Sequence, residues 1–129
     1  MSKRILVVDD DERVRLVFQK ALARLGSGYQ VEVAQNGREA LEKAMEEPFD
    51  LIMTDLRMPE LGGVELTKAI KRYCPDTIVV WMTSYGCHSL AAEARLLAVY
   101  RCLEKPLEVS EIRQVAREAL ESAGAHSRG

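Results

Sequence analysis

Short apolar runs alternate along this chain with longer segments in which apolar residues recur every three or four positions. The short runs have the length and β-branched content of buried strands, and the longer segments have the period of amphipathic helices. Strands are predicted at 5–8, 30–34, 51–53, 77–82 and 100–103, each followed by a helix, at 12–25, 38–46, 64–73, 88–97 and 108–122. Strands without a polar face need helices on both sides and right-handed crossovers between them. This order therefore predicts an α/β fold with a five-stranded parallel sheet, (βα)5, doubly wound, with helices on both faces.

Four of the predicted helices carry a clear apolar face that we expect to lie against the sheet. The residues assigned to these faces are Val14, Val17, Phe18, Ala21, Leu22 and Leu25; Ala40, Leu41, Ala44 and Met45; Val64, Leu66, Ala69, Ile70 and Tyr73; and Ile112, Val115, Ala116, Ala119 and Leu120.

A chain of 129 residues suits one domain, which we place at 1–122, with 123–129 as a flexible tail or the start of a linker. The net charge of −2 is too balanced for non-specific binding to nucleic acid or for polybasic attachment to a membrane. No apolar run approaches the ~20 residues of a membrane span, so a cytoplasmic location is expected. Cys74, Cys87 and Cys102 match no zinc or CxxC spacing, and we expect them to be reduced packing residues.

Polar side chains stand where four of the predicted strands end. They are Asp9-Asp10-Asp11 after the first strand, Asp55 after the third, Thr83-Ser84 after the fourth and Lys105-Pro106 after the fifth. The carboxyl ends of parallel strands meet at one edge of a sheet, where doubly wound proteins bind their ligands. We therefore expect these groups to lie together.

Carboxylates crowded at this edge would repel each other by roughly 4 kcal/mol per pair at ~4 Å and an effective dielectric constant near 20. Raised pKa values, helix capping or a bound cation could each account for such a cluster. A small cation with oxygen ligands and a phosphate partner would be Mg²⁺. Asp55 would then serve as a nucleophile toward a phosphoryl group, whose oxygens Lys105 and the Thr83 hydroxyl would bind.

Each residue alone has a simpler interpretation. Asp10 or Asp11 would cap the first helix, Asp55 would belong to a turn, and Lys105 would be a solvated charge. Their joint placement at four strand ends makes these separate explanations improbable together.

The chain resembles the receiver domain of two-component response regulators over about residues 3–121, which implies a flavodoxin-like fold. The stretches that carry the resemblance are Ile5-Leu6-Val7-Val8-Asp9-Asp10-Asp11, Asp55-Leu56-Arg57-Met58-Pro59-Glu60-Leu61-Gly62-Gly63, Met82-Thr83-Ser84 and Leu103-Glu104-Lys105-Pro106. Four such motifs in the right order, on the right elements, are a specific signal.

The resemblance implies that Asp55 accepts a phosphoryl group from the phosphohistidine of a sensor histidine kinase or phosphotransfer protein. It implies that Asp9 and Asp10, with Asp55 and the backbone carbonyl of Arg57, bind Mg²⁺. The chain would then be a signalling switch that assists its own phosphorylation and dephosphorylation, and not a turnover enzyme.

Two further residues take family roles by resemblance. Thr83 matches the switch hydroxyl, and Lys105 matches the lysine that pairs with the phosphate, in a Lys-Pro bond that is usually cis. Phosphorylation would change the face made by strand 4, helix 4, strand 5 and helix 5. That face would control a partner or an attached effector, and a phosphorylation-dependent homodimer is left open.

The sequence departs from the family pattern at two positions. Cys102 stands three residues before Lys105, where receivers usually carry a Tyr or Phe that turns inward on activation. Gly62 stands where an acidic or polar residue is usual. In addition, Arg57 and Tyr85 occupy positions that flank the phosphate in receivers. We expect the Arg57 side chain to be solvated, and at most to pair with the phosphate and tune the lifetime of the phosphoryl group.

Three other functions fit parts of the pattern. A degenerate receiver acting as a constitutive interaction module would fit Cys102, but the intact acidic and phosphate-binding residues argue against it. A phosphatase with an aspartate nucleophile needs an acid two residues after Asp55, where Arg57 stands. A flavin-binding protein of similar architecture needs a phosphate-cradling loop after the first strand, which this sequence lacks.

Overall fold

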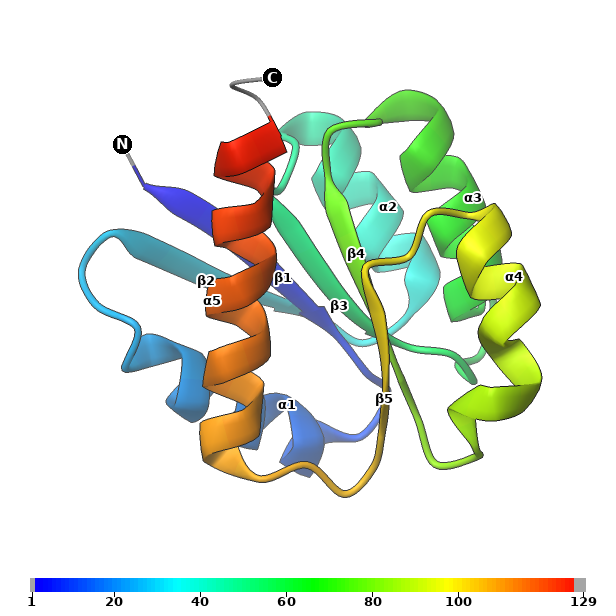
Figure 1. Cartoon of the computed structure of the whole chain (residues 1–129), viewed down its shortest axis with the longest axis horizontal. Coiled ribbons are helices and arrows are strands. Elements are labelled where there is room, and N and C mark those ends of the chain that lie inside the picture. The colour runs from blue at the N-terminus through cyan, green and yellow to red at the C-terminus, as the bar shows by residue number, and fades with distance from the viewer. Residues whose placement is uncertain (1, 127–129) are drawn as a thin grey trace.

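The computed structural model describes residues 2–126, with side chains described through 122. Its core is a sheet of five parallel strands in the order β2-β1-β3-β4-β5 (Figure 1). The strands are β1 (Lys3–Val8), β2 (Tyr29–Ala34), β3 (Leu51–Asp55), β4 (Ile78–Thr83) and β5 (Arg101–Glu104). The predicted parallel sheet is confirmed.

Helices cover both faces of this sheet, as predicted. They are α1 (Glu12–Ala23), α2 (Gly37–Glu46), α3 (Gly63–Tyr73), α4 (Ala91–Leu96) and α5 (Val109–His126), with a short 3₁₀ helix, η1 (Cys87–Leu90), before α4. The α1 and α5 helices pack together on one face, whereas α2, α3 and α4 cover the other (Figure 1). Because β1 connects to β2 on one side while β3 lies on its other side, the strand order reverses between β1 and β3. This reversal places the expected ligand site at the carboxyl ends of these two strands.

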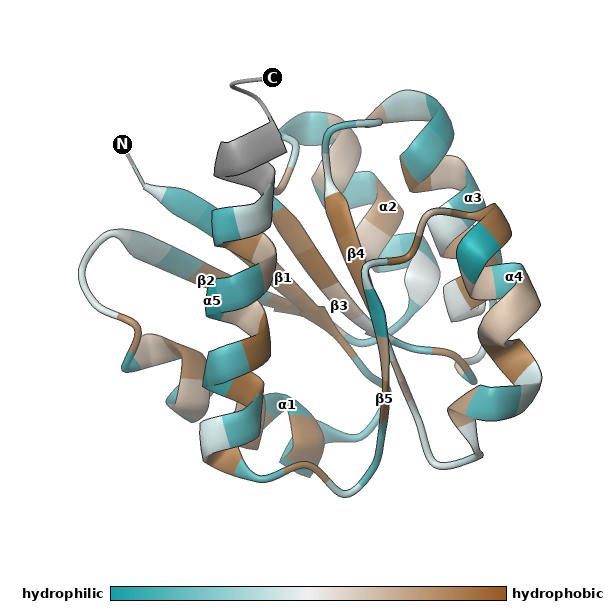
Figure 2. Ribbon diagram, in the orientation of Figure 1, coloured by the Kyte–Doolittle hydropathy of each residue, from teal (hydrophilic) through white to brown (hydrophobic). Residues whose placement is uncertain are grey.

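The β1 strand illustrates why the middle of the sheet is apolar. Ile5 and Val7 point into the core beneath α1 and α5, whereas Leu6 and Val8 point into the core beneath α2 and α3. All four side chains are fully buried, and Figure 2 shows the middle of the sheet as mainly hydrophobic. A strand buried on both faces has no position for a solvent-facing residue.

A buried hydrogen-bond chain joins α3 to β4. The Trp81 indole Nε1 donates to Thr67 Oγ1 at 2.8 Å, and the Thr67 hydroxyl donates to the Gly63 carbonyl at 2.7 Å. Trp81 and Thr67 are both fully buried, so each polar group needs the partner that it has here. This chain fixes α3 against the strand that ends in Thr83.

The predicted helix faces are correct at their centres and wrong at their margins. Val17, Met45 and Tyr73 were expected in the core but are 43%, 55% and 55% exposed. Each lies at the edge of its helix's apolar stripe, and how far the sheet covers that stripe depends on the packing of the helix.

The last helix is longer than predicted. The sequence placed its end at 122, whereas α5 extends through His126 and so includes the first part of the segment assigned to a tail, 123–129. Residues 127–129 lie outside the described residues. Within residues 2–126, no helix is both long enough and apolar enough to cross a membrane.

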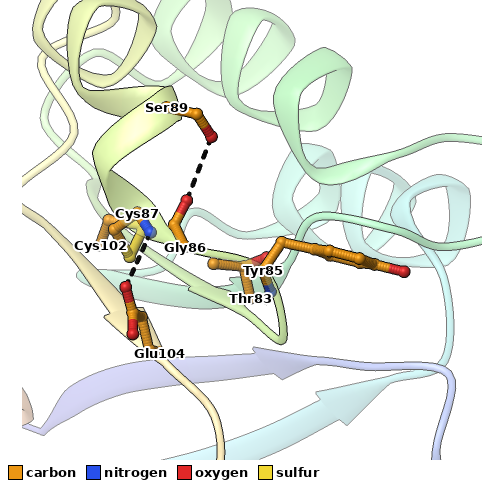
Figure 3. The surroundings of a disulfide bond; sticks show 7 residues. All are labelled: Thr83, Tyr85, Gly86, Cys87, Ser89, Cys102 and Glu104. Carbon is orange, nitrogen blue, oxygen red and sulfur yellow. Dashed lines mark hydrogen bonds between the residues drawn. A yellow bond between two sulfur atoms is a disulfide. The ribbon is translucent and has the colours of Figure 1, made fainter.

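The expectation of three reduced cysteines is wrong for two of them. Cys87, at the start of η1, and Cys102, in β5, form a disulfide with a Cα–Cα distance of 5.8 Å (Figure 3). The pair was not apparent from spacing because it arises from the neighbouring positions of β4 and β5 in the sheet, not from a local motif. Cys74 has a free thiol.

Candidate functional site

Three aspartates meet at the reversal of strand order. Asp9 directly follows β1 and is fully buried, Asp55 is the last residue of β3 and is 8% exposed, and Asp10 is exposed. One carboxylate oxygen from each lies within 4.8 Å of the others. The sheet therefore brings together residues that the sequence separates by more than forty positions, as the strand-end argument predicted.

The side chains of the consecutive aspartates after β1 make different contacts. The Asp11 side chain accepts the Arg13 N–H at 2.9 Å and is the N-cap of α1, so the simplest interpretation of one aspartate is correct for Asp11. Asp9 Oδ1 accepts the Asp11 N–H at 2.9 Å, which aims the second carboxylate oxygen at the site. Arg15 Nη1 donates to the Asp9 carbonyl at 2.7 Å and holds the backbone of this turn.

Lys105 enters the site from the end of β5. Its Nζ lies 2.6 Å from Asp9 Oδ2 and 3.4 Å from Asp55 Oδ1. Its backbone N–H donates to the Thr83 carbonyl at 2.8 Å, which links the ends of β4 and β5. The following peptide bond, Lys105-Pro106, is cis, as the family resemblance implied.

Burial and neighbouring charges perturb the acid–base behaviour of both groups. Burial, with a smaller contribution from the Asp9 charge, raises the pKa of Asp55, although the Lys105 ammonium and the Leu56 N–H oppose this shift. Burial alone would lower the pKa of Lys105, but the hydrogen bond and charge of Asp9, together with the charge of Asp55, raise it overall. The site therefore holds a firmly protonated ammonium between two carboxylates, one of which is costly to ionise.

The Thr83 hydroxyl lies at the same edge but is engaged with its own loop. Its side chain is 2% exposed, and Oγ1 accepts the Tyr85 N–H at 3.0 Å. The hydroxyl proton remains able to donate to another acceptor. The Tyr85 ring is half exposed, and the central carbon of the Arg57 guanidinium lies 4.0 Å from the centroid of that ring.

Residues 5–117 match the response regulator receiver domain family, and this match covers most of the chain. This chain is a receiver domain. Two of its relatives differ in how much of their own length the match covers. A transcriptional regulatory protein, ZraR, from Klebsiella oxytoca is 43% identical over 124 residues, which are 96% of this chain and 27% of that protein. The sporulation initiation phosphotransferase F of Bacillus subtilis is 31% identical over 120 residues, 93% of this chain and 95% of that protein.

Solved structures of receiver domains agree with this fold. A CheY-like response regulator receiver domain protein from Methanospirillum hungatei superposes with a TM-score of 0.90 at 25% identity, covering 98% of this chain and 99% of that one. The receiver domain described here spans about a quarter of the length of the ZraR regulator, 27%.

The donor set of this receiver domain fits a small divalent cation. Three carboxylates and one ammonium leave two negative charges, which one divalent ion would balance. Ligands that are all oxygens, with Asp10 open to solvent, suit Mg²⁺, which retains several waters. The backbone carbonyl of Arg57 remains a predicted fourth protein ligand.

The sequence predicted no role in shaping the site for Gly63, which lies in one of the matching motifs, or for Arg15. Gly63 packs against the backbone of Asp55, and a Cβ at this position would collide with the Asp55 carbonyl. Arg15, which donates to the Asp9 carbonyl, also holds the site's backbone, and an arginine in the first turn of a helix does not signal such a role. A glycine at the start of a helix beside the loop that follows Asp55 was the one available sign, because close backbone approach requires it.

Proposed function

We propose that this receiver domain is a phosphorylation-activated switch in which Asp55 accepts the phosphoryl group. The observation that carries the proposal is the arrangement of Asp55 at the end of β3, with Asp9 and Asp10 beside it and the Lys105 ammonium 3.4 Å away. This arrangement provides a nucleophile, a site for a divalent cation and a fixed positive charge within one small space.

The transfer step needs little covalent chemistry from the protein. An Asp55 carboxylate oxygen attacks phosphorus, the N–P bond of a phosphohistidine breaks, and the imidazole nitrogen keeps that electron pair. The chemistry that Mg²⁺ supplies when bound between Asp9, Asp10 and Asp55 is neutralisation of phosphoryl oxygens. Lys105 binds a second phosphoryl oxygen and so stabilises charge as it accumulates. Each chain takes up one phosphoryl group, which makes it a stoichiometric acceptor and not a turnover enzyme.

The same residues convert the modification into a change of surface. A phosphoryl group on Asp55 offers new acceptor oxygens to the Thr83 hydroxyl, which here accepts the Tyr85 N–H of its own loop. Movement of Thr83 toward Asp55 displaces the loop that leads into η1 and α4. Because Lys105 is hydrogen-bonded to the Thr83 carbonyl, β5 and the start of α5 are drawn into the same change.

The partners follow from this role. The phosphoryl donor would be a sensor histidine kinase or a phosphotransfer protein, and the altered surface would act on an effector domain or protein in the cytoplasm. A homodimer of the phosphorylated chain is a further outcome of the same surface change. The size of ZraR, of which this chain matches only part, supports an attached effector, whereas the full-length match to phosphotransferase F supports a separate partner.

The proposal is tested by the intact mass of the chain after incubation with Mg²⁺ and acetyl phosphate. We expect one added phosphoryl group in the native chain and none in Asp55→Asn or without Mg²⁺. Asp76→Asn is the matched control, since Asp76 is exposed and lies before β4, at the opposite end of the sheet. A folded chain that gains no phosphoryl group at any donor concentration contradicts the proposal and leaves a constitutive interaction module.

A further inference from the structure

We propose that Cys87 and Cys102 form a reversible redox site that couples an oxidant to this switch. In the oxidised form, the disulfide holds the β4–α4 loop against β5 and opposes the active arrangement. In the reduced form, loop and strand are free to move apart. The existence of the redox site is independent of the proposed function, whereas its effect on signalling depends on that function.

The two cysteines are well placed to join and to separate. Their Cα atoms are 5.8 Å apart, within the usual range for a disulfide, so closure requires no displacement of the backbone. Both residues are half-buried, and both therefore remain open to small oxidants and reductants. Disulfides that solvent can reach are the labile and regulatory ones, in contrast to those sealed in a core.

Each cysteine lies close in sequence to a residue that is expected to respond to phosphate. Cys87 follows Thr83 by four residues (Figure 3). Cys102 precedes Lys105 by three residues. Two hydrogen bonds join the same segments: the Cys87 N–H donates to Glu104 Oε1 at 3.0 Å, and the Lys105 N–H donates to the Thr83 carbonyl at 2.8 Å. The exposed hydrogen bond of Cys87 can exchange with water, but the disulfide cannot. Since the Lys105–Thr83 hydrogen bond joins the strand ends in both redox forms, the disulfide decides whether η1 moves independently of β5.

The position of Cys102 also places the disulfide beside the core that α4 covers. Cys102 pairs with Trp81 across the β4–β5 ladder and, like Leu90 and Ala94, packs against the buried cluster that contains Trp81. A bond at this position ties the start of η1, and with it α4, to the strand. The side chain that departs from the family pattern thus replaces a mobile ring by a covalent link that can be opened.

The chemistry balances with a hydroperoxide as the oxidant. One thiolate attacks the peroxide oxygen, the O–O bond breaks, and the products are a cysteine sulfenic acid and water or an alcohol. The second thiol then attacks the sulfenic sulfur, the S–S bond forms, and water leaves. Two electrons pass from the cysteine pair to the peroxide. A dithiol reductant reverses the process by thiol–disulfide exchange.

The pairing is tested on the full chain by alkylation of free thiols and intact mass. After hydrogen peroxide treatment and denaturation, we expect one alkylated cysteine, Cys74, and after dithiothreitol we expect all three. Cys74→Ser should form the same disulfide, whereas Cys87→Ser should not. Alkylation of all three cysteines after peroxide would overturn the proposed site.

The coupling is tested by the affinity of each redox form for trifluoroberyllate, a phosphoryl mimic, in the presence of Mg²⁺. We expect the oxidised chain to bind it about tenfold more weakly than the reduced chain, a ratio typical of coupling between sites. Cys74→Ser should keep this difference. Cys87→Ser cannot form the disulfide, so under both conditions it should bind as tightly as the reduced native chain. Comparing the native chain with and without reductant gives the same contrast without any substitution.

Two results would contradict the coupling in different ways. Equal affinity in the two redox forms, with the disulfide verified by mass, overturns the coupling alone. Absence of binding in both forms overturns the proposed function, and the coupling with it, while the disulfide measured by alkylation still stands.

Discussion

Replacing Lys105 by methionine tests whether its ammonium neutralises the acidic site. Methionine keeps most of the aliphatic chain and removes the charge. At an effective dielectric constant near 20, the distances of 2.6 Å to Asp9 and 3.4 Å to Asp55 correspond to attractions of roughly 6 and 5 kcal/mol. The Asp9 and Asp55 oxygens, within 4.8 Å, repel by roughly 3 kcal/mol or more on the same scale. The attraction of the ammonium to the two carboxylates therefore exceeds the repulsion between them.

The free energy of unfolding that Lys105→Met loses is smaller than these Coulomb energies. Lys105 is partly desolvated in the native state, which offsets part of the attraction, and its side chain is 18% exposed, so water screens the rest. Breaking a buried ion pair by removing one partner costs about 3–5 kcal/mol, and we expect a value near the lower end. Urea unfolding at pH 7 without divalent cations measures it, with the fluorescence of Trp81, the only tryptophan and fully buried, as the signal.

Lys68→Met is the matched control for this experiment, because Lys68 is exposed on α3 and should change stability by less than about 0.5 kcal/mol. Adding Mg²⁺ should stabilise Lys105→Met more than the native chain, because the cation supplies the missing positive charge. A Lys105→Met variant as stable as Lys68→Met would refute the idea that this ammonium holds the carboxylates together.

Three further predictions concern Asp55, the buried hydrogen-bond chain and the disulfide. Because burial raises the pKa of Asp55, its ionisation opposes folding, so Asp55→Asn should be more stable than the native chain at pH 7. Urea unfolding across a range of pH measures this difference. The advantage should disappear as the pH falls below 3.8, the ordinary pKa, because the folded and unfolded chains then both carry the protonated acid. A neutral-pH stability equal to the native value would contradict the shift. Thr67→Val should lower the free energy of unfolding by about 1–3 kcal/mol, since it leaves the buried Trp81 N–H without its acceptor, and urea unfolding measures the loss. Reducing the Cys87–Cys102 disulfide, with a sequence separation of 15, should cost about 3 kcal/mol in the same assay through the entropy of the unfolded chain, and Cys74→Ser should preserve the difference between redox forms.

The sequence was sufficient for the sheet and for the residues at its edge. Apolar runs without a polar face predict parallel strands with helices on both sides, and parallel strands bring their carboxyl ends together. The sequence therefore predicts one site for four residues, Asp9, Asp55, Thr83 and Lys105. The structure places Lys105 in contact with an aspartate 96 positions earlier.

Features that depend on how neighbouring elements pack were not accessible in this way. The disulfide requires η1 to lie over β5, which no spacing of cysteines reveals. The stacking of Arg57 on Tyr85 joins two loops whose conformations are set by separate strands. Similarly, the exposure of Val17 and Met45 depends on how far each helix is rotated against the sheet.

The most direct test of the account is to locate the phosphoryl group. After incubation with Mg²⁺ and acetyl phosphate, borohydride reduces an aspartyl phosphate to homoserine, and peptide mass spectrometry identifies the converted position. The account predicts conversion at position 55 and nowhere else in the acidic cluster. Conversion at position 9, 10 or 11, with Asp55 unchanged, would contradict the assignment of Asp55 as the phosphoacceptor.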